Sequence, residues 1–277
     1  MKEENVKEIV RKRYAKVAKN KGSNCGCAPS SSCCSAPSDE QVSKMIGYSE
    51  DEMSVVPEGA NLGLGCGNPT AMASLKEGER VLDLGSGGGF DCFLAAKKVG
   101  KTGKVIGVDM TPEMLDKART NAKKGKYTNV EFRLGEIENL PLADSSVDVI
   151  ISNCVINLAP NKKRVFEEAF RVLAPNGRLL VSDIVLLKPL PEEIQKSAEA
   201  YTSCIAGAEI KDKYLGLIRD AGFKDVKVLS EKNYPLDFVL SEPEVRSVVS
   251  NLKLAKEEVN ETANSIVSIS VSALKQK

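Results

Sequence analysis

The 277-residue chain has an ordinary globular composition, with 42% hydrophobic and 28% charged residues and a formal net charge of +1. This near-neutral balance predicts no nucleic acid or anionic membrane as a partner. The start MKEENVKEIVRKRY has no apolar secretory core, and no segment approaches the ~18 apolar residues of a membrane span, so we expect a cytoplasmic protein.

Residues 1–75 are predicted to hold a helix, a cysteine-rich loop and a glycine-rich segment. Apolar residues recur at helical spacing from Val6 to Val17, with Lys and Arg between them, which indicates an amphipathic lid or brace. Residues 21–37 are rich in Gly, Ser, Pro and Cys and too poor in large apolar groups to pack by themselves. The segment EGANLGLGCGNP, from Glu58 to Pro69, then places Cys66 between two glycines.

Residues 76–188 alternate between strands and helices, which is typical of crossover units on a parallel sheet. The predicted strands are the apolar run from Val81, then Lys104–Asp109, Val130–Leu134, Asp148–Asn153 and Arg178–Ile184. Thr111 is expected to cap one helix, with Pro112 at its first position. Another helix is expected to carry apolar residues from Val165 to Leu173, and residues 175–177 to turn the chain into the last strand. The pattern predicts an α/β fold with a mostly parallel sheet.

Residues 189–277 are expected to complete the sheet as a C-terminal extension. Pro189 and Pro191 are predicted to lead into a helical segment that reaches Tyr201, Cys204 and Gly207. Helices at residues 211–221 and 243–259 and a short strand at 226–229 are also predicted. From Val267 to Ala273, apolar residues alternate with serines, which predicts a half-exposed final strand.

The stretch VLDLGSGGGFD, from Val81 to Asp91, carries the first functional signal. Glycines between a strand and a helix leave bare backbone N–H groups for the oxygens of a nucleotide-like ligand, although an ordinary tight connection has the same pattern. Asp109 ends the next strand about 20 residues later, where a carboxylate receives ribose hydroxyls. Phe90 replaces the third glycine of the dinucleotide fingerprint, which argues against NAD.

The 8 cysteines and the absence of histidine give the second signal. Without histidine, the chain lacks the usual acid–base group at neutral pH and the commonest metal ligand. In an intracellular chain, cysteines indicate reduced thiols for soft metals or redox work more than a disulfide framework. Cys154 follows the fourth strand, at the edge where α/β sheets bind ligands, but a buried structural thiol is an equally ordinary interpretation. Cys92 is assigned to the core.

Taken together, these motifs resemble known enzymes. DLGSGGG followed by an acid after the next strand is similar to class I methyltransferases that use S-adenosylmethionine, and NLGLGCGNP, GVDMTPEML and SNCVINLAP extend the resemblance to arsenite methyltransferases. The resemblance implies a Rossmann-like core, S-adenosylmethionine with no permanent metal, and arsenite or its thiol conjugates as substrate. It implies that Cys66, Cys154 and Cys204 bind trivalent arsenic and that an N-terminal cysteine is their redox partner, reduced by thioredoxin or a small thiol. Cys25, Cys27, Cys33 and Cys34 are all candidates for this partner, and we favour Cys33 or Cys34. The implied cofactor residues are Asp83, Gly85, Ser86, Gly87, Gly89, Asp109, Met110, Glu136, Ile137 and Asn153.

The chemistry is consistent with this resemblance. Arsenic held by three thiolates keeps a lone pair, and a lone-pair nucleophile needs no deprotonation, so methylation needs no histidine. Two other hypotheses remain open. The chain could methylate a small organic carbon or oxygen nucleophile, which would require a general base, or it could be a cysteine-rich metalloid or redox sensor without turnover.

Overall fold

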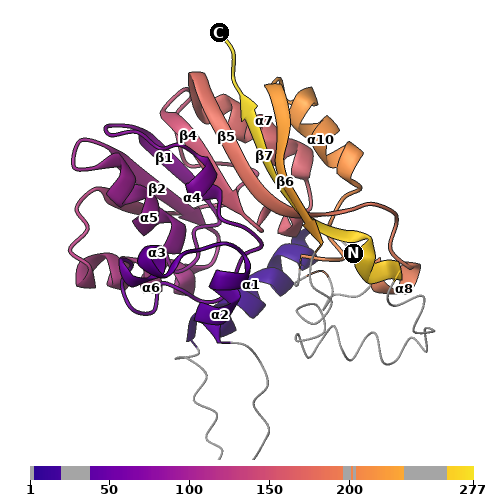
Figure 1. Cartoon of the computed structure of the whole chain (residues 1–277), viewed down its shortest axis with the longest axis horizontal. Helices are drawn as coiled ribbons and strands as arrows, with labels where there is room; N and C mark the ends of the chain where they lie inside the picture. The colour runs from indigo at the N-terminus through magenta and orange to yellow at the C-terminus, as the bar shows by residue number, and fades with distance from the viewer. Residues whose placement is uncertain (1–2, 20–37, 196–200, 202–203, 234–260) are drawn as a thin grey trace, which may run out of the picture.

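A computed structural model describes residues 3–19, 38–195, 201, 204–233 and 261–277 of the chain. In this part of the chain, seven strands form one sheet in the order β3-β2-β1-β4-β5-β7-β6 (Figure 1). The strands are β1 Arg80–Leu84, β2 Lys104–Asp109, β3 Val130–Leu134, β4 Val147–Asn153, β5 Leu173–Leu186, β6 Lys224–Asn233 and β7 Ile266–Leu274. Strands β1 to β5 are parallel to one another, whereas β7 lies antiparallel to both β5 and β6. The expected mostly parallel α/β fold is confirmed.

Helices pack on both faces of the sheet, because successive residues of a strand point to opposite faces. In β1, Val81 packs into the cluster that includes Phe93 of α5 and Leu115 of α6, whereas Leu82 packs with Phe166 of α7. The helices are α1 Glu3–Lys19, α2 Asp39–Met45, α3 Glu50–Ser54, α4 Pro69–Met72, α5 Phe90–Val99, α6 Pro112–Lys124, α7 Lys162–Val172, α8 Glu192–Gln195 and α10 Lys211–Asp220, with a short 3-10 turn at Ile156–Leu158.

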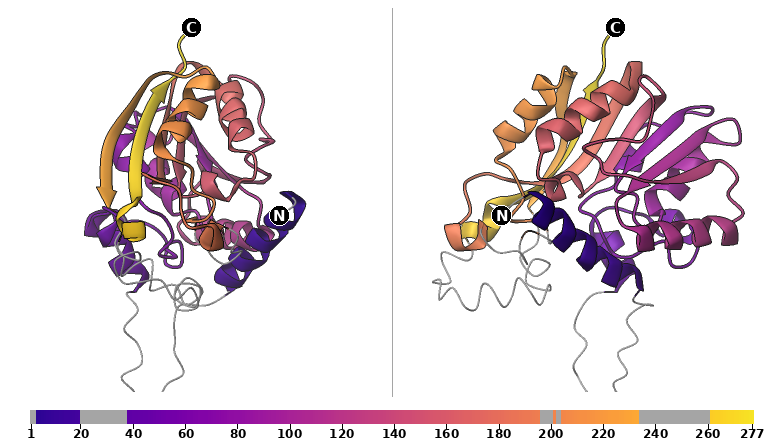
Figure 2. Two further views of the ribbon diagram at one scale, coloured as in Figure 1. Left: turned by 90° about the vertical axis from the view of Figure 1, so that its right-hand side faces the viewer. Right: turned by 180° about the vertical axis from the view of Figure 1, so that it is seen from behind.

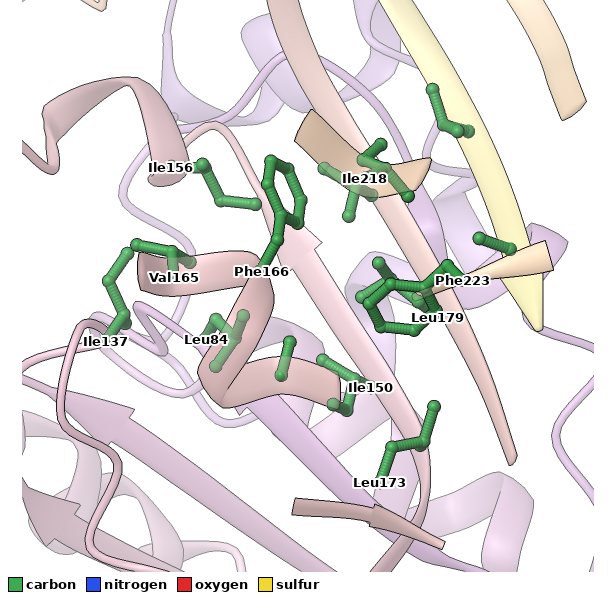
Figure 3. Packing of buried hydrophobic residues seen from close by; sticks show 14 of the residues in the cluster. Leu84, Ile137, Ile150, Ile156, Val165, Phe166, Leu173, Leu179, Ile218 and Phe223 are labelled. Atoms are coloured by element: carbon green, nitrogen blue, oxygen red, sulfur yellow. The ribbon is translucent and has the colours of Figure 1, made fainter. Parts of the chain in front are cut away.

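The larger core lies between the sheet and the helices α7 and α10 (Figure 3). Phe166 meets Tyr214 edge to face, with ring centroids 5.4 Å apart, and both side chains are fully buried. Aromatic and aliphatic side chains buried in this way each contribute about 1.5–3 kcal/mol relative to exposure. The core therefore fixes the sheet whose carboxyl ends carry the polar residues of interest.

The helix α1 lies at those carboxyl ends. Figure 1 shows α1 and α2 at the lower edge of the sheet, toward which the parallel strands run, and Figure 2 shows α1 crossing that edge when the molecule is seen from behind. Lys7 of α1 reaches Glu136 at 2.7 Å and Glu138 at 2.8 Å, which ties the helix to the segment after β3. The predicted N-terminal helix is confirmed, and it covers the edge where ligands bind in such sheets.

Two predicted boundaries around β5 are wrong. Leu173 begins the strand instead of ending the helix, and the expected turn at residues 175–177 lies within β5. Asn176 adopts a left-handed φ of +64°, and its N–H donates to the carbonyl of Lys275, so the backbone pairs across the irregularity. The chain bulges here without leaving the sheet.

Other local predictions also need correction. Thr111 stands at the N-cap of α6, as expected, but its side chain makes no capping hydrogen bond. The helix predicted to reach Gly207 is wrong at its end: α8 and Tyr201 are helical, but Cys204 lies in a turn with a φ of +63°. The strand β6 is longer than the predicted 226–229.

The strand β7 is more buried than the expected half-exposed strand. On its serine face Ser268 and Ser272 are half-buried, whereas Ser270 is only 6% exposed and its hydroxyl lies 3.1 Å from that of Ser182. Ser268 donates to the carbonyl oxygen of Cys66 at 2.6 Å. The serine face of β7 therefore packs under the glycine-rich segment around Cys66.

Some predictions fall on residues that the structure does not describe. The loop at 21–37, with Cys33 and Cys34, and the helix at 243–259 lie in these ranges. The division of the chain at residues 75 and 188 stays a prediction. Among the described residues, no helix is both long and apolar enough to cross a bilayer.

Candidate active site

A cavity of about 470 Å³, the central cavity, opens at the carboxyl ends of the strands. Its walls come from α1, the glycine loop after β1, the ends of β2 and β4, and the segments around residues 60–65 and 204–205. Pockets of this size at the crossover point of an open α/β sheet are the usual ligand sites of such folds. Both signals found in the sequence meet in this cavity.

The glycine loop bends into a shape that side chains would block. Gly85, Gly87 and Gly89 have φ values of +69°, +50° and +93°, in the left-handed region that favours glycine. A Cβ atom on Gly85 would lie 2.4 Å from a methyl carbon of Val155. The N–H groups of Gly85, Ser86 and Gly87 are bonded within the fold, to the carbonyl of Val108 and to Asp109. Gly89 is the N-cap of α5, and the residues of its first turn that line the cavity, Phe90 and Asp91, have N–H groups without a partner inside the helix.

Two polar side chains of the loop region are suited to a ligand. The hydroxyl of Ser86 is buried at the cavity wall and finds no hydrogen-bond partner in the described part of the chain. Such an unpaired buried group is costly unless a ligand or water satisfies it. Asp83 lies deeper, where it accepts a hydrogen bond from the Cys92 thiol at 3.2 Å, and burial raises the pKa of its carboxyl group well above the usual value.

Asp109 at the end of β2 is braced against the glycine loop. One carboxylate oxygen accepts from the N–H of Gly87 at 2.9 Å and the other from the N–H of Thr111 at 2.8 Å. Burial raises the pKa of Asp109, and these two N–H donors oppose the shift. Met110, Glu136 and Ile137 line the same part of the cavity. The structure thus brings together the residues proposed for a nucleoside.

Asn153 lines the cavity, but its side-chain amide is hydrogen-bonded to the loop around Cys66. Its carbonyl oxygen accepts from the N–H of Cys66 at 3.0 Å, and its NH2 group donates to the carbonyl of Gly67 at 2.9 Å. The same NH2 group donates to the Tyr48 hydroxyl at 2.9 Å and reaches Asp91 at 3.3 Å. A direct contact of Asn153 with cofactor stays a prediction, and the structure gives Asn153 a positioning role that the sequence did not suggest.

Three cysteines from distant segments approach one another beside the cavity, and two of them, Cys154 and Cys204, line it. The sulfur of Cys66, the sulfur of Cys154 and a carboxylate oxygen of Asp183 lie within 4.8 Å of one another. Cys204 donates its thiol proton to the carbonyl of Cys154 at 3.1 Å and also lines the cavity with Cys154. Cys66 is 5% exposed and lies behind Gly65, whereas Cys154 is half-buried. Cys33 and Cys34 lie outside the described residues.

The thiols of this cluster are held in their neutral form. Burial raises the pKa of the Cys66 thiol, and the hydrogen bond with Cys154 together with burial raises that of Cys204 well above its usual value. A thiol in this state is a poor nucleophile, but it loses its proton readily when a thiophilic centre coordinates the sulfur. The arrangement is therefore better suited to binding a soft metalloid or metal than to nucleophilic attack by a free thiolate.

Sequence reasoning missed four residues that shape the site. Asp183 stands in an apolar strand and Tyr48 in a short loop, and neither segment carried a signal. In the sequence, Lys7 is one of several cations on a predicted helix, and Ser268 is one of three serines in an alternating strand, so neither pattern indicates a role in the site. Each acts through a contact with a distant segment, which a local pattern does not reveal.

Comparison with known proteins agrees with this geometry. The profile of a methyltransferase domain family matches residues 75–222, more than half of the chain. The chain is 49% identical over 241 residues to an arsenite methyltransferase of Halobacterium salinarum, covering 85% of this chain and 61% of that protein. It is 39% identical to an arsenite methyltransferase of Aquipseudomonas alcaligenes, covering 81% of this chain and 64% of that protein.

A solved structure shows the same fold. The crystal structure of an arsenic(III) S-adenosylmethionine methyltransferase from Chlamydomonas reinhardtii matches with a TM-score of 0.62 and 33% identity, over 85% of this chain and 73% of that one. The chain spans less than two thirds of the length of the two curated relatives named above. The Rossmann-like sheet is that of class I methyltransferases, and the chain belongs to the family of methyltransferase domains.

Proposed function

We propose that the chain transfers a methyl group from S-adenosylmethionine to trivalent arsenic held by Cys66, Cys154 and Cys204. The observation that carries this proposal is the approach of the three thiols, because Cys154 and Cys204 line the same cavity as the glycine loop and Cys66 lies next to Cys154. The similarity to proteins named arsenite methyltransferases supports the choice of acceptor.

The cofactor is expected at the loop end of the cavity, where bound S-adenosylmethionine supplies an electrophilic methyl group on a sulfonium sulfur. The N–H groups at the N-terminus of α5 and the unpaired hydroxyl of Ser86 are suited to the carboxylate of the amino-acid part. Asp109 is suited to the ribose hydroxyls, and Glu136 with Ile137 to the adenine. Lys7 holds α1 across this edge through its ion pair with Glu136. In this position α1 covers the reacting groups and keeps water away from them.

The acceptor end needs no general base. The thiols lose their protons as they become ligands of arsenic, and the remaining lone pair of arsenic is the nucleophile. The main catalytic task is position, because the lone pair and the methyl carbon must approach in line at about 3 to 3.5 Å. The backbone of Cys66 is held for this purpose by the hydrogen bond that its N–H donates to Asn153 and by the one that its carbonyl oxygen accepts from Ser268.

Methyl transfer oxidises arsenic from the trivalent to the pentavalent state, so two electrons must return. We propose that Cys66 and either Cys33 or Cys34 supply them by forming a disulfide with loss of two protons. Thioredoxin or a small thiol then reduces this disulfide by exchange. A cytoplasmic location, where thiols are kept reduced, belongs to the same proposal, as does the absence of nucleic acid and membrane among its partners.

The test compares Cys154→Ser with Cys92→Ser, which alters a buried cysteine beside Asp83 that does not belong to the cluster. With arsenite, cofactor and a thiol reductant, the unchanged chain should make methylated arsenic. Cys154→Ser should lose arsenite binding and turnover but keep its cofactor affinity, and Cys92→Ser should keep all three. Methylation of an organic acceptor that survives Cys154→Ser would refute the proposal, and so would arsenite binding without consumption of cofactor.

A further inference from the structure

The tightest group of ligand atoms in the described part of the chain is not the trio of cysteines. It comprises two sulfurs and one oxygen, from Cys66, Cys154 and Asp183, all within 4.8 Å of one another. These residues come from the glycine-rich segment, the end of β4 and the middle of β5, so the fold itself brings them together. Asp183 is fully buried, and methylation as proposed above gives it no part.

Asp183 is held in a fixed orientation by three donors. One of its oxygens accepts from the side chain of Asn157 at 2.8 Å and from the N–H of Ile184 at 2.9 Å, and the other accepts from the hydroxyl of Tyr214 at 3.0 Å. A carboxylate offers about four lone-pair sites, so one remains to face the thiols. Hydrogen bonds of this kind orient the ligands of protein metal sites before the metal arrives.

The donor set matches a class of ion other than trivalent arsenic. Three thiols suffice for arsenic, whereas zinc and similar divalent cations take four ligands and accept carboxylate oxygen beside sulfur. Zinc–sulfur bonds of about 2.3 Å would place two thiolate sulfurs on the order of 4 Å apart. The spacing of the cluster is close enough that small side-chain shifts would close it around such an ion.

We propose that Cys66, Cys154 and Asp183 form a binding site for a divalent thiophilic cation of the zinc and cadmium class. The fourth position is open to Cys204, whose thiol contacts Cys154, or to water. The site shares two of its thiols with the arsenic ligands of the proposed function, so cation and arsenite exclude each other. Asp183 separates the two modes of binding, because it serves as a ligand only to the cation.

The experiment uses the full chain, reduced and freed of metal, and titrates it with Co²⁺ in the absence of cofactor and arsenite. One equivalent should produce a thiolate-to-cobalt charge-transfer band that Zn²⁺ or Cd²⁺ abolishes. Asp183→Asn, which keeps the shape of the side chain, should weaken binding about tenfold or more. Asp148→Asn, which alters an acid paired with Arg80 at the far end of β4, should bind as the unchanged chain does.

Three results would overturn the proposal: no band at one equivalent, an unchanged affinity in Asp183→Asn, or a band that persists in Cys154→Ser. If Asp183→Asn fails to fold, X-ray absorption of the zinc-loaded unchanged chain counts the ligands directly. At least two sulfurs with at least one oxygen support the site, and four sulfurs or none refute it. These readouts require no methyl transfer, so they stand whether or not arsenite proves to be the acceptor.

Discussion

Replacing Asn153 with alanine would separate two roles for this residue, cofactor binding and control of the Cys66 loop. The change removes the acceptor for the N–H of Cys66 and the donor for the carbonyl of Gly67. A buried group left without a partner costs about 1–3 kcal/mol, and partial access of water to this loop favours the lower end for each. We therefore expect a loss of about 2 kcal/mol in the ordering of the loop, equivalent to about 30-fold in arsenite affinity.

The assay is calorimetric titration of Asn153→Ala with arsenite and, separately, with S-adenosylhomocysteine. Affinity for arsenite should fall by the amount given above, while affinity for the cofactor product should change by about threefold at most. Asn129→Ala is the matched control. The side-chain NH2 group of Asn129 also donates to backbone carbonyls, those of Ala96 and Gly100, but Asn129 does not line the cavity. It should lose stability but bind both ligands normally.

An equal loss of affinity for both ligands, or a larger loss for the cofactor product, would refute this reasoning. Asn153 would then belong to the cofactor site, as the resemblance implied. If Asn129→Ala also weakened arsenite binding, the effect of Asn153→Ala would have to be attributed to global destabilisation.

Three further predictions test other parts of the site. Gly85→Ala places a methyl group against Val155 at a left-handed φ, which should cost about 2–4 kcal/mol and weaken S-adenosylhomocysteine binding in a titration; unchanged affinity would contradict the proposed loop contact. Burial raises the pKa of Asp91 to about 6, so the folded state holds this proton more tightly than the unfolded state does. Stability should fall by up to about 3 kcal/mol as pH rises from 4 to 6, and urea unfolding of Asp91→Asn should lack this part of the pH dependence. Lys7→Met should loosen α1, visible as faster amide exchange in residues 3–19 with a loss of about 1 kcal/mol; unchanged exchange would show that the ion pair with Glu136 does not hold the helix.

The parts of the fold that follow local rules were predictable from the sequence. The strands at Lys104–Asp109 and Val130–Leu134 have the predicted boundaries, because an apolar run bounded by turn residues has few alternatives. The glycine loop was predictable for the same reason, since the left-handed turn at Gly85 and Gly87 depends on the residues themselves.

The acceptor end of the site depends on tertiary contacts and was predicted only through a family resemblance. Nothing in the spacing of Cys66 and Cys154 indicates that their sulfurs approach each other, because their segments meet only after the sheet has formed. Asp183 sits in an apolar strand, where alternation alone does not reveal which groups face it. The burial of β7 was missed because a strand that alternates apolar and serine residues fits a sheet edge as well as a covered interior position.

The position of β7 has a consequence for the order in which the protein forms during synthesis. All residues that line the central cavity precede β7 in the chain, and the glycine loop can reach its final form once β1, β2 and β4 have paired. The carbonyl oxygen of Cys66, by contrast, gains its hydrogen bond only from Ser268, which leaves the ribosome some 200 residues later. A nascent chain therefore acquires its nucleotide-binding half first, and the Cys66 segment stays unassembled, with its thiol open to oxidation, until the last strand inserts.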